Sequence, residues 1–383
     1  MANGSTVNFD SPQIGWRNLY LHIPFCAGKC GYCAFYSESC SSLTLRKEYL
    51  QKIAGFLERV HFTREVDTVY IGGGTPDLLT YPELEFLFSA IEKYVPQSSD
   101  CEISCELNPE CLTASKLALL NERVTRLSLG VQSFDPLVRK KLMRRCRDEH
   151  LRNALKLLEK RQVKHFNIDL IYGVSDVEFA VFANDMQQAW DCGIDHLSCY
   201  ALTAEENSRL GLAAPVADDA SAADWWLRIG DFLSSRGLER YEISNYALPN
   251  CGCRHNLNVW CGETLLGVGA SAAGFDGCDR YTFPASVDGF IAGEAPEIDR
   301  VTPQLRMLEI FAVNLRTTAG WQKSVWDKLY PATWDTLLDF CCRQSRINPQ
   351  WWQIRSDKIA LSEDGLLFWD DAAMEIIDWD GLL

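Results

Sequence analysis

The chain has 383 residues, of which 47% are hydrophobic and 23% charged, the composition of an ordinary soluble globular protein with room for two domains. Its formal net charge of −15 disfavours nonspecific binding to nucleic acid or to anionic membrane surfaces, because both need a surplus of lysine and arginine. No run of about 18 apolar residues predicts a transmembrane helix. The first residues lack the features of a secretory signal, so the 16 cysteines are expected to be reduced thiols in the cytoplasm.

Short apolar runs alternate with longer amphipathic segments over the first two thirds of the chain. Strands are predicted at residues 19–23, 68–71, 102–106, 126–131, 166–171, 196–200 and 241–244. Helices are predicted at residues 45–60, 82–94, 114–121, 136–145 with 150–160, 178–190 and 220–235. This alternation predicts parallel strands with crossover helices. The number of repeats favours a partial (β/α)6-type barrel, with its chemistry at the carboxyl ends of the strands.

Three cysteines, Cys26, Cys30 and Cys33, follow the first predicted strand in a C-x3-C-x2-C pattern. Three thiolates are one too few for a closed tetrahedral zinc site or a fully ligated [4Fe–4S] cluster. A [4Fe–4S] cluster held by three cysteines therefore keeps one iron open for an external ligand. Ordinary buried cysteines are the alternative, because a free thiol packs as a small apolar group. The spacing favours the cluster.

Polar groups and glycines end the next predicted strands. The run from Gly72 to Pro76 lets the backbone approach a ligand closely, although such glycines are also common in plain turns. Glu106 offers a carboxylate for ribose hydroxyls or for a surface ion pair. Gln132 offers amide donors and an acceptor, Arg144 a planar fork for a carboxylate, and Asp169 a second carboxylate. Because these ends meet at one edge of the sheet, the sequence predicts a single site.

The alternation stops after about residue 246. A segment rich in cysteine and glycine, 250–278, precedes a helix-rich tail whose tryptophans are expected in a second core. The run at 358–368 predicts part of a small winged-helix-like unit. The spacings of Cys251, Cys253, Cys261 and Cys278 fit no common zinc pattern, so structural or incidental roles are expected. The predicted division is a tail at 1–15, a barrel domain at 16–245 and a smaller α+β domain at 246–383.

The cysteine loop, with Tyr32 inside it, resembles the radical S-adenosylmethionine (SAM) superfamily, in which SAM chelates the open iron. Together with residues 72–76, 129–134, 167–173, 196–203 and 241–258, it is similar to the oxygen-independent coproporphyrinogen III oxidase family and its heme-chaperone branch. The resemblance covers residues 19–274 and implies that the three cysteines hold a [4Fe–4S] cluster. It also implies SAM contacts from Tyr20, Tyr32, Gly73, Gly74, Thr75, Glu106, Gln132, Arg144 and Asp169.

Two features separate the branches of this family. The oxidases carry a fourth cysteine where this chain has Phe35, and their arm before the cluster is longer. The run 254–260 is similar to the H-N-x-x-Y-W signature of the chaperone branch, with Val259 in place of the tyrosine, and Ala273 stands where a histidine is common. In that run, His255 is either a ligand of heme iron or a hydrogen-bonded residue that supports the barrel mouth.

These differences favour the function that the chaperone branch implies. Such a protein binds heme or a related porphyrin and delivers it to hemoproteins, such as respiratory enzymes. The cluster and SAM would serve assembly or release, and an electron donor would reduce the cluster. The alternative is oxidative decarboxylation of coproporphyrinogen III to protoporphyrinogen IX. Nothing in the sequence shows that SAM is cleaved productively, so the sequence leaves open whether the protein is an enzyme.

Overall fold

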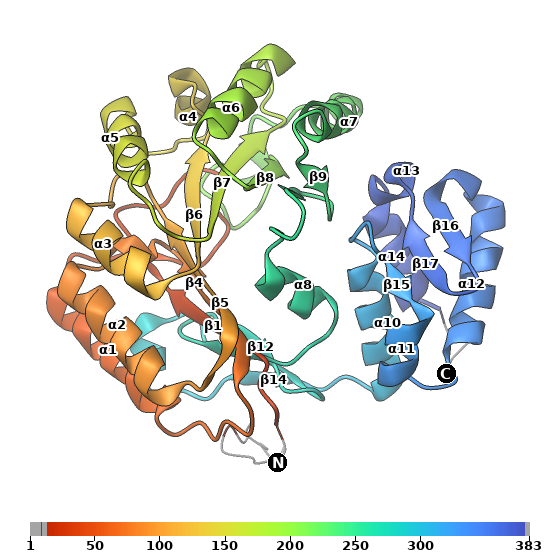
Figure 1. Cartoon of the computed structure of the whole chain (residues 1–383), viewed down its shortest axis with the longest axis horizontal. Coiled ribbons are helices and arrows are strands. Elements are labelled where there is room, and N and C mark those ends of the chain that lie inside the picture. The colour runs from red at the N-terminus through yellow and green to blue at the C-terminus, as the bar shows by residue number, and fades with distance from the viewer. Residues whose placement is uncertain (1–8, 10–13, 380–383) are drawn as a thin grey trace.

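The computed structural model describes residue 9 and residues 14–379. Six strands run parallel and in chain order through one large sheet: β1 (Asn18–Ile23), β4 (Val66–Gly73), β5 (Gln97–Leu107), β6 (Arg126–Gln132), β7 (His165–Tyr172) and β8 (His196–Ala201). The crossover helices are α1 (Leu43–Leu57), α2 (Tyr81–Tyr94), α3 (Ala114–Arg123), α4 (Pro136–Lys141) with α5 (Asp148–Leu158), and α6 (Phe179–Asp191), and α7 (Asp219–Ser234) follows β8. These helices cover the outer side of the curved sheet (Figure 1). The predicted partial (β/α)6-type barrel is confirmed.

Local sequence explains why the helices begin where they do. Thr80 forms a capping box with Glu83 at the start of α2, and Asp135 accepts hydrogen bonds from the first main-chain N–H groups of α4. Both helices carry a proline in their first turn, where its missing N–H costs nothing. Helix α4 ends at Lys141, earlier than the predicted 145, because Met143 takes a left-handed conformation with φ 50°. That turn releases Arg144 from the helix and points it toward the sheet.

The sheet continues beyond the six strands at both edges. On one side, β11 (Leu265–Val268) pairs parallel with β1 and leads to the antiparallel strands β12 (Ala273–Phe275), β13 (Arg280–Thr282) and β14 (Glu297–Asp299). On the other side, β10 (Asn245–Ala247) pairs antiparallel with β8 and with β9 (Glu239–Arg240). The strand predicted at 241–244 is wrong, since this segment is the turn between β9 and β10. The buried Glu242 carboxylate stabilises the turn by accepting a hydrogen bond from the main-chain N–H of Ser244 at 2.8 Å.

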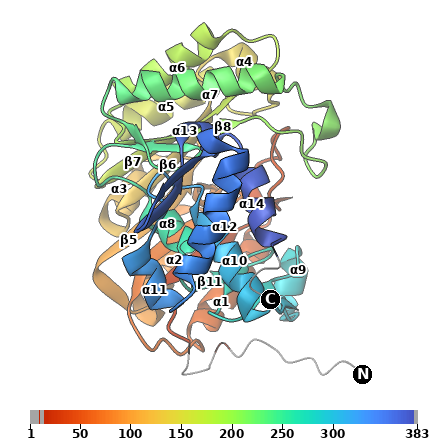
Figure 2. The ribbon, with the colours of Figure 1, turned by 90° about the vertical axis from the view of Figure 1, so that its right-hand side faces the viewer.

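A smaller α+β unit follows the sheet. It contains α10 (Pro303–Asn314), α11 (Lys323–Leu329), α12 (Trp334–Ile347), α13 (Glu363–Leu366) and α14 (Trp369–Ile377), with the antiparallel strands β15 (Trp321–Gln322), β17 (Lys358–Leu361) and β16 (Trp352–Arg355). Trp321, Trp326 and Trp334 lie in its core, as predicted. Figure 2 shows this unit in front of the open side of the barrel. Arg316 ties it to the barrel through an ion pair with Glu242 at 2.9 Å.

The predicted domain division after residue 245 remains a prediction. Strands β11 to β14 follow that position and yet belong to the same sheet as β1. This pairing favours a division closer to the start of α10. Helix α8 (Arg254–Trp260) lies inside the barrel, where it contacts β1, β4 and α10 (Figure 1). Among the described helices, none has the length and apolar character needed to cross a membrane.

Candidate functional site

A cavity of about 460 Å³ opens at the carboxyl ends of the parallel strands. Most residues that the sequence assigns to the cluster and to SAM line this one cavity: Cys26, Cys30, Tyr32, Cys33, Gly73, Gly74, Thr75, Glu106, Gln132, Arg144 and Asp169. They come from the loop after β1 and from the ends of β4 to β7, together with the turn after α4. Parallel strands bring their carboxyl ends to one edge of a barrel, which is why residues far apart in sequence meet here.

The cysteine loop passes close to the glycine run after β4. A methyl group added at Gly74 would lie 3.0 Å from the Cys26 sulfur and 2.8 Å from the carbonyl oxygen of Phe25. Gly74 also donates its main-chain N–H to the carbonyl of Ile23 at 2.8 Å. Any larger residue at Gly74 would therefore displace the loop that carries the first thiol.

A hydrogen-bond chain holds two of the thiols. The Asn108 side-chain amide donates to the Thr75 hydroxyl at 2.6 Å, which leaves the hydroxyl proton free for the Cys26 sulfur at 3.4 Å. Arg144 donates to the Cys30 sulfur at 3.4 Å and to the Asn108 side-chain oxygen at 2.7 Å. These side chains therefore face the sulfur atoms that would bind a metal as thiolates.

Arg144 is itself held firmly in place. Its guanidinium donates to the carbonyl of Gly130 at 2.9 Å and forms an ion pair with Glu110 at 3.5 Å. Burial opposes its positive charge, but Tyr32, Glu110 and Cys30 outweigh that effect and raise the pKa of Arg144. The side chain therefore places a fixed positive charge next to the cysteine loop.

Two partly buried carboxylates face the cavity from β5 and β7. Glu106 accepts hydrogen bonds from the Tyr70 hydroxyl at 2.9 Å and from the Gly73 main-chain N–H at 3.0 Å. Asp169 accepts from the Ser128 hydroxyl at 2.8 Å. Burial raises the pKa of Glu106 to about 7 and also raises the pKa of Asp169. Desolvated carboxylates of this kind suit hydroxyl donors from a ligand.

Two unusual backbone conformations also lie at this edge of the sheet, next to the cavity. Gly73 has φ 111°, a conformation that side chains rarely adopt, and a methyl group there would lie 2.7 Å from the ring of His22. Gln132 ends β6 with φ 72°, next to an irregularity in the pairing of β6 with β7. This irregularity turns the Gln132 side chain into the cavity lining.

Two of the predicted contacts lie elsewhere. Tyr20 is not among the lining residues of the described cavity, and its hydroxyl bonds to His22 Nδ1 at 2.9 Å. His255 is 5% exposed inside the barrel, where its Nδ1 bonds to the Thr68 hydroxyl at 2.7 Å. Burial lowers the pKa of His255 to about 3, so the ring is neutral. Thr68 lies near the start of β4, so this histidine lies toward the base of the barrel rather than at its mouth.

The structure adds cavity residues that the sequence reasoning missed. Asn108, Glu110 and Cys111 follow β5, and Tyr200 ends β8. The Asn108–Pro109 pair, which begins two residues after Glu106, was the available signal, because it marks the strand end at which the site lies. Asn108 matters most to the site, since its side chain hydrogen-bonds to both Arg144 and Thr75.

The donor set fits an iron–sulfur cluster better than a single ion. In the described part of the chain, only His165, Asp195 and Cys251 bring three ligand atoms within 4.8 Å of one another, so the three thiols of the loop are more widely spread. A cluster accepts such spacing because each cysteine binds a different iron. Position 35 is a phenylalanine, so the cysteine loop itself offers three thiols to such a cluster. Burial next to Asp77 and Glu110 raises the pKa of the remaining cavity thiol, Cys111, which lies outside this loop.

The same architecture and motifs occur in known proteins. Residues 20–186 match the Radical SAM superfamily. The heme chaperone HemW of Escherichia coli (strain K12) is 35% identical over 272 residues, which are 70% of this chain and 71% of that protein. The chain belongs to the HemW family. The HemW of Haemophilus influenzae is 28% identical over 382 residues, covering 93% of this chain and 97% of its own length.

A solved structure agrees with the fold of this HemW family member. Coproporphyrinogen III oxidase HemN from Escherichia coli, a radical SAM enzyme, superposes with a TM-score of 0.80. The superposition covers 96% of this chain and 91% of HemN, at 18% sequence identity. At that identity the similarity shows the shared fold, and it includes the smaller unit as well as the barrel.

Proposed function

We propose that this chain holds a [4Fe–4S] cluster and SAM in the cavity, and that it binds heme and transfers it to hemoproteins. The convergence of Cys26, Cys30 and Cys33 with the glycine run and two partly buried carboxylates carries the first part. Similarity to HemW proteins over more than two thirds of the chain supports the second part. We also infer a cytoplasmic location, because the cysteines of the described chain are all free thiols, which suits a reducing compartment.

The loop cysteines would hold the cluster, and their neighbours would tune it. Thr75 lies 3.4 Å from the Cys26 sulfur and Arg144 donates to the Cys30 sulfur, so both side chains would hydrogen-bond to the thiolates that hold the cluster. The cluster that these cysteines would hold would supply one-electron chemistry toward SAM once an electron donor had reduced it. The protein's own contribution is to fix the ligands and to keep water away from the cavity.

The remaining cavity groups would orient SAM. Gly73 and Gly74 let its methionine end approach the backbone, and Glu106 would accept hydrogen bonds from the ribose hydroxyls. Gln132 and Asp169 face the same space, next to Tyr32. Tyr20 would act only through His22, since its hydroxyl bonds to that ring.

The mouth of the cavity offers an apolar surface to a porphyrin. Phe35, in the position of the fourth cysteine of the oxidases, is 70% exposed and lines the cavity. Tyr200, which is 41% exposed, also lines it. Flat aromatic surfaces at the mouth suit stacking on a porphyrin ring. The burial of His255 disfavours it as the iron ligand, so that contact stays a prediction.

The deciding experiment combines three measurements on anaerobically reconstituted protein. Heme titration followed by absorption should show saturable binding, and mixing the heme-loaded protein with an apo-hemoprotein should transfer the heme. Incubation with coproporphyrinogen III, SAM and a reductant should yield no protoporphyrinogen. Turnover of coproporphyrinogen, or absence of heme binding, would favour the oxidase alternative instead, which the HemN-like fold supports only at the level of architecture.

A further inference from the structure

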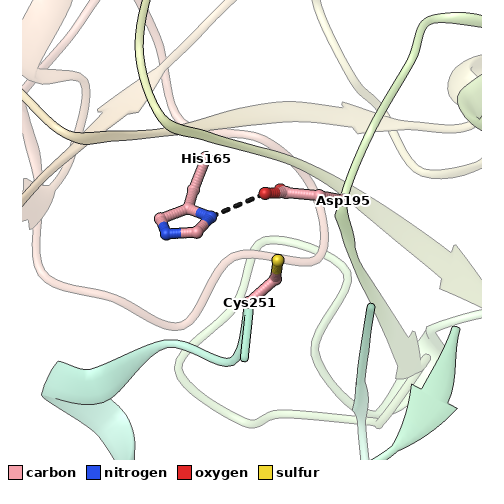
Figure 3. A group of neighbouring side chains, drawn as sticks. All are labelled: His165, Asp195 and Cys251. Atoms are coloured by element: carbon pink, nitrogen blue, oxygen red, sulfur yellow. Dashed lines mark hydrogen bonds and ion pairs between the residues drawn. The ribbon is translucent and has the colours of Figure 1, made fainter. Parts of the chain in front are cut away.

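A group of side chains of the types that bind metal ions lies at the opposite end of the barrel from the cavity. His165 begins β7, Asp195 precedes β8, and Cys251 lies in the loop between β10 and α8. One ligand atom from each residue lies within 4.8 Å of the other two, and Figure 3 shows the three side chains pointing toward one another. It is the one group of three histidine, cysteine or acidic side chains that the described residues hold at this spacing.

Two of the three ligands are already oriented. His165 Nδ1 and Asp195 Oδ2 are 2.6 Å apart, which fixes the imidazole ring. The other oxygen of Asp195 accepts the main-chain N–H of Phe166 at 2.9 Å. Asp195 therefore presents a single oxygen to the group, in a geometry that its neighbours hold without a metal.

The third ligand is placed by its backbone and leaves its sulfur available. Arg126 donates to the carbonyls of Cys251 and Gly252, at 2.8 and 3.1 Å. The main-chain N–H of Leu248 donates to the Asp195 carbonyl at 2.9 Å, which keeps this loop against the barrel. The Cys251 sulfur contacts the carbonyl of Pro249 at 3.6 Å, and burial next to Asp195 raises the pKa of the thiol. It is partly exposed, so an ion from solution can reach it.

We propose that His165, Asp195 and Cys251 bind a zinc-class divalent metal ion, with water as the fourth ligand. Imidazole nitrogen, carboxylate oxygen and thiolate sulfur are the donors that zinc takes in proteins. Binding requires Cys251 to release its thiol proton to solvent. It also requires the ring proton of His165 to move to Nε2, so that the ion replaces the hydrogen bond that Nδ1 now donates to Asp195.

The local charge is compatible with a dication. The Asp195 carboxylate and the Cys251 thiolate together balance two positive charges. Arg126, which contacts the loop, is paired with the Glu102 carboxylate at 3.2 Å. The ion would join β7, the turn before β8 and the segment that enters α8. The site is therefore structural, and it anchors the helix that carries the 254–260 motif.

Metal analysis of the cluster-loaded protein tests this site. The protein is dialysed against Zn²⁺, then against metal-free buffer, and its zinc and iron are measured by mass spectrometry. We expect about one retained zinc per chain in the parent protein. Cys251→Ser and His165→Gln should lose this zinc and keep their iron. Cys278→Ser, which changes an exposed cysteine outside the group, is the matched control and should keep both metals.

Cobalt gives an independent measurement. Co²⁺ bound to a thiolate adds a sulfur-to-metal charge-transfer absorption, which a difference spectrum separates from the iron–sulfur absorption. We expect this band in the parent protein and in Cys278→Ser, and its loss in Cys251→Ser. If His165→Gln does not fold, the milder Cys251→Ser substitution decides. A parent protein that retains no zinc, or a Cys251→Ser protein that retains as much as the parent, would overturn the proposal.

Discussion

The two ends of the barrel use buried polar residues in opposite ways. At the amino-terminal end, the polar groups bind one another: Arg126 pairs with Glu102 at 3.2 Å, and His196 bonds to Asn167 and Tyr241 at 2.6 and 2.8 Å. At the carboxyl-terminal end, the polar groups keep hydrogen-bonding capacity directed into a cavity.

This difference distinguishes the polar residues that stabilise the fold from those that line the candidate site. Glu106 and Glu102 are both carboxylates on β5, four residues apart; Glu102 is buried and Glu106 is partly buried. Glu102 faces a guanidinium, whereas Glu106 faces a hydroxyl, one N–H group and open space. A buried carboxylate without a cation carries a cost in stability that a ligand can offset.

The largest expected effect is loss of all cluster iron. Replacing Cys26, Cys30 and Cys33 together by alanine removes every proposed ligand, so the purified protein should contain no iron–sulfur cluster. Iron analysis and the visible absorption of anaerobically reconstituted protein measure this.

A matched triple variant serves as its control. Cys192, Cys278 and Cys342 lie outside the cavity lining, and replacing them together by serine should leave the iron content unchanged. Equal iron in the two triple variants would contradict the assignment of the cluster to the cavity.

The second largest expected effect is a loss of stability from a substitution at the amino-terminal end of the barrel. Glu102→Gln leaves the buried Arg126 charge without its partner, which should cost about 3–5 kcal/mol in the free energy of unfolding. Urea denaturation measures this, and SAM affinity of the folded protein should not change. The control is Glu92→Gln at the exposed pair with Arg123, where we expect a change below about 1 kcal/mol.

A smaller, pH-dependent effect is expected at Glu106. Its pKa rises from 4.5 to about 7 on folding, so the folded state binds this proton more tightly. The resulting stability is complete below pH 4.5 and is lost as the pH rises through about 7. Glu106→Gln should remove this part of the pH dependence, and it should weaken SAM binding about tenfold because a neutral amide accepts hydrogen bonds less strongly.

Asp77→Asn is the matched control for Glu106→Gln. Burial also raises the pKa of Asp77 to about 7, but Asp77 does not line the cavity. The control should therefore flatten the pH dependence of unfolding without changing SAM affinity, as measured by calorimetry. Equal SAM affinity for Glu106→Gln and the parent protein would remove Glu106 from the SAM site.

The smallest expected effect concerns heme and His255. His255→Gln should lose the buried hydrogen bond to Thr68, at about 1–2 kcal/mol of stability, and leave heme affinity unchanged. Heme titration of the folded variant checks this. A clear loss of heme affinity would show that the histidine reaches heme in a rearranged protein, and it would restore the ligand role considered from the sequence.

The local features of this protein could be predicted from its amino-acid pattern alone. Apolar runs about the length of a strand and segments with helical periodicity predicted the parallel barrel, because such patterns act through near neighbours. The three-cysteine motif predicted the cluster ligands without any long-range information. Two predictions of local structure were wrong. Residues 241–244 form a turn around the Glu242 carboxylate rather than a strand, and helix α4 ends before Arg144.

The contacts between residues that are far apart in the chain could be seen only in the folded structure. The path from Arg144 through Asn108 and Thr75 to Cys26 joins four separate segments of the chain, and no spacing rule predicts it. In the structure, His255 lies in the interior of the barrel rather than at its mouth as expected, and Cys251 lies next to His165 and Asp195. These contacts depend on strand order and register, which place side chains that are far apart in the chain next to one another.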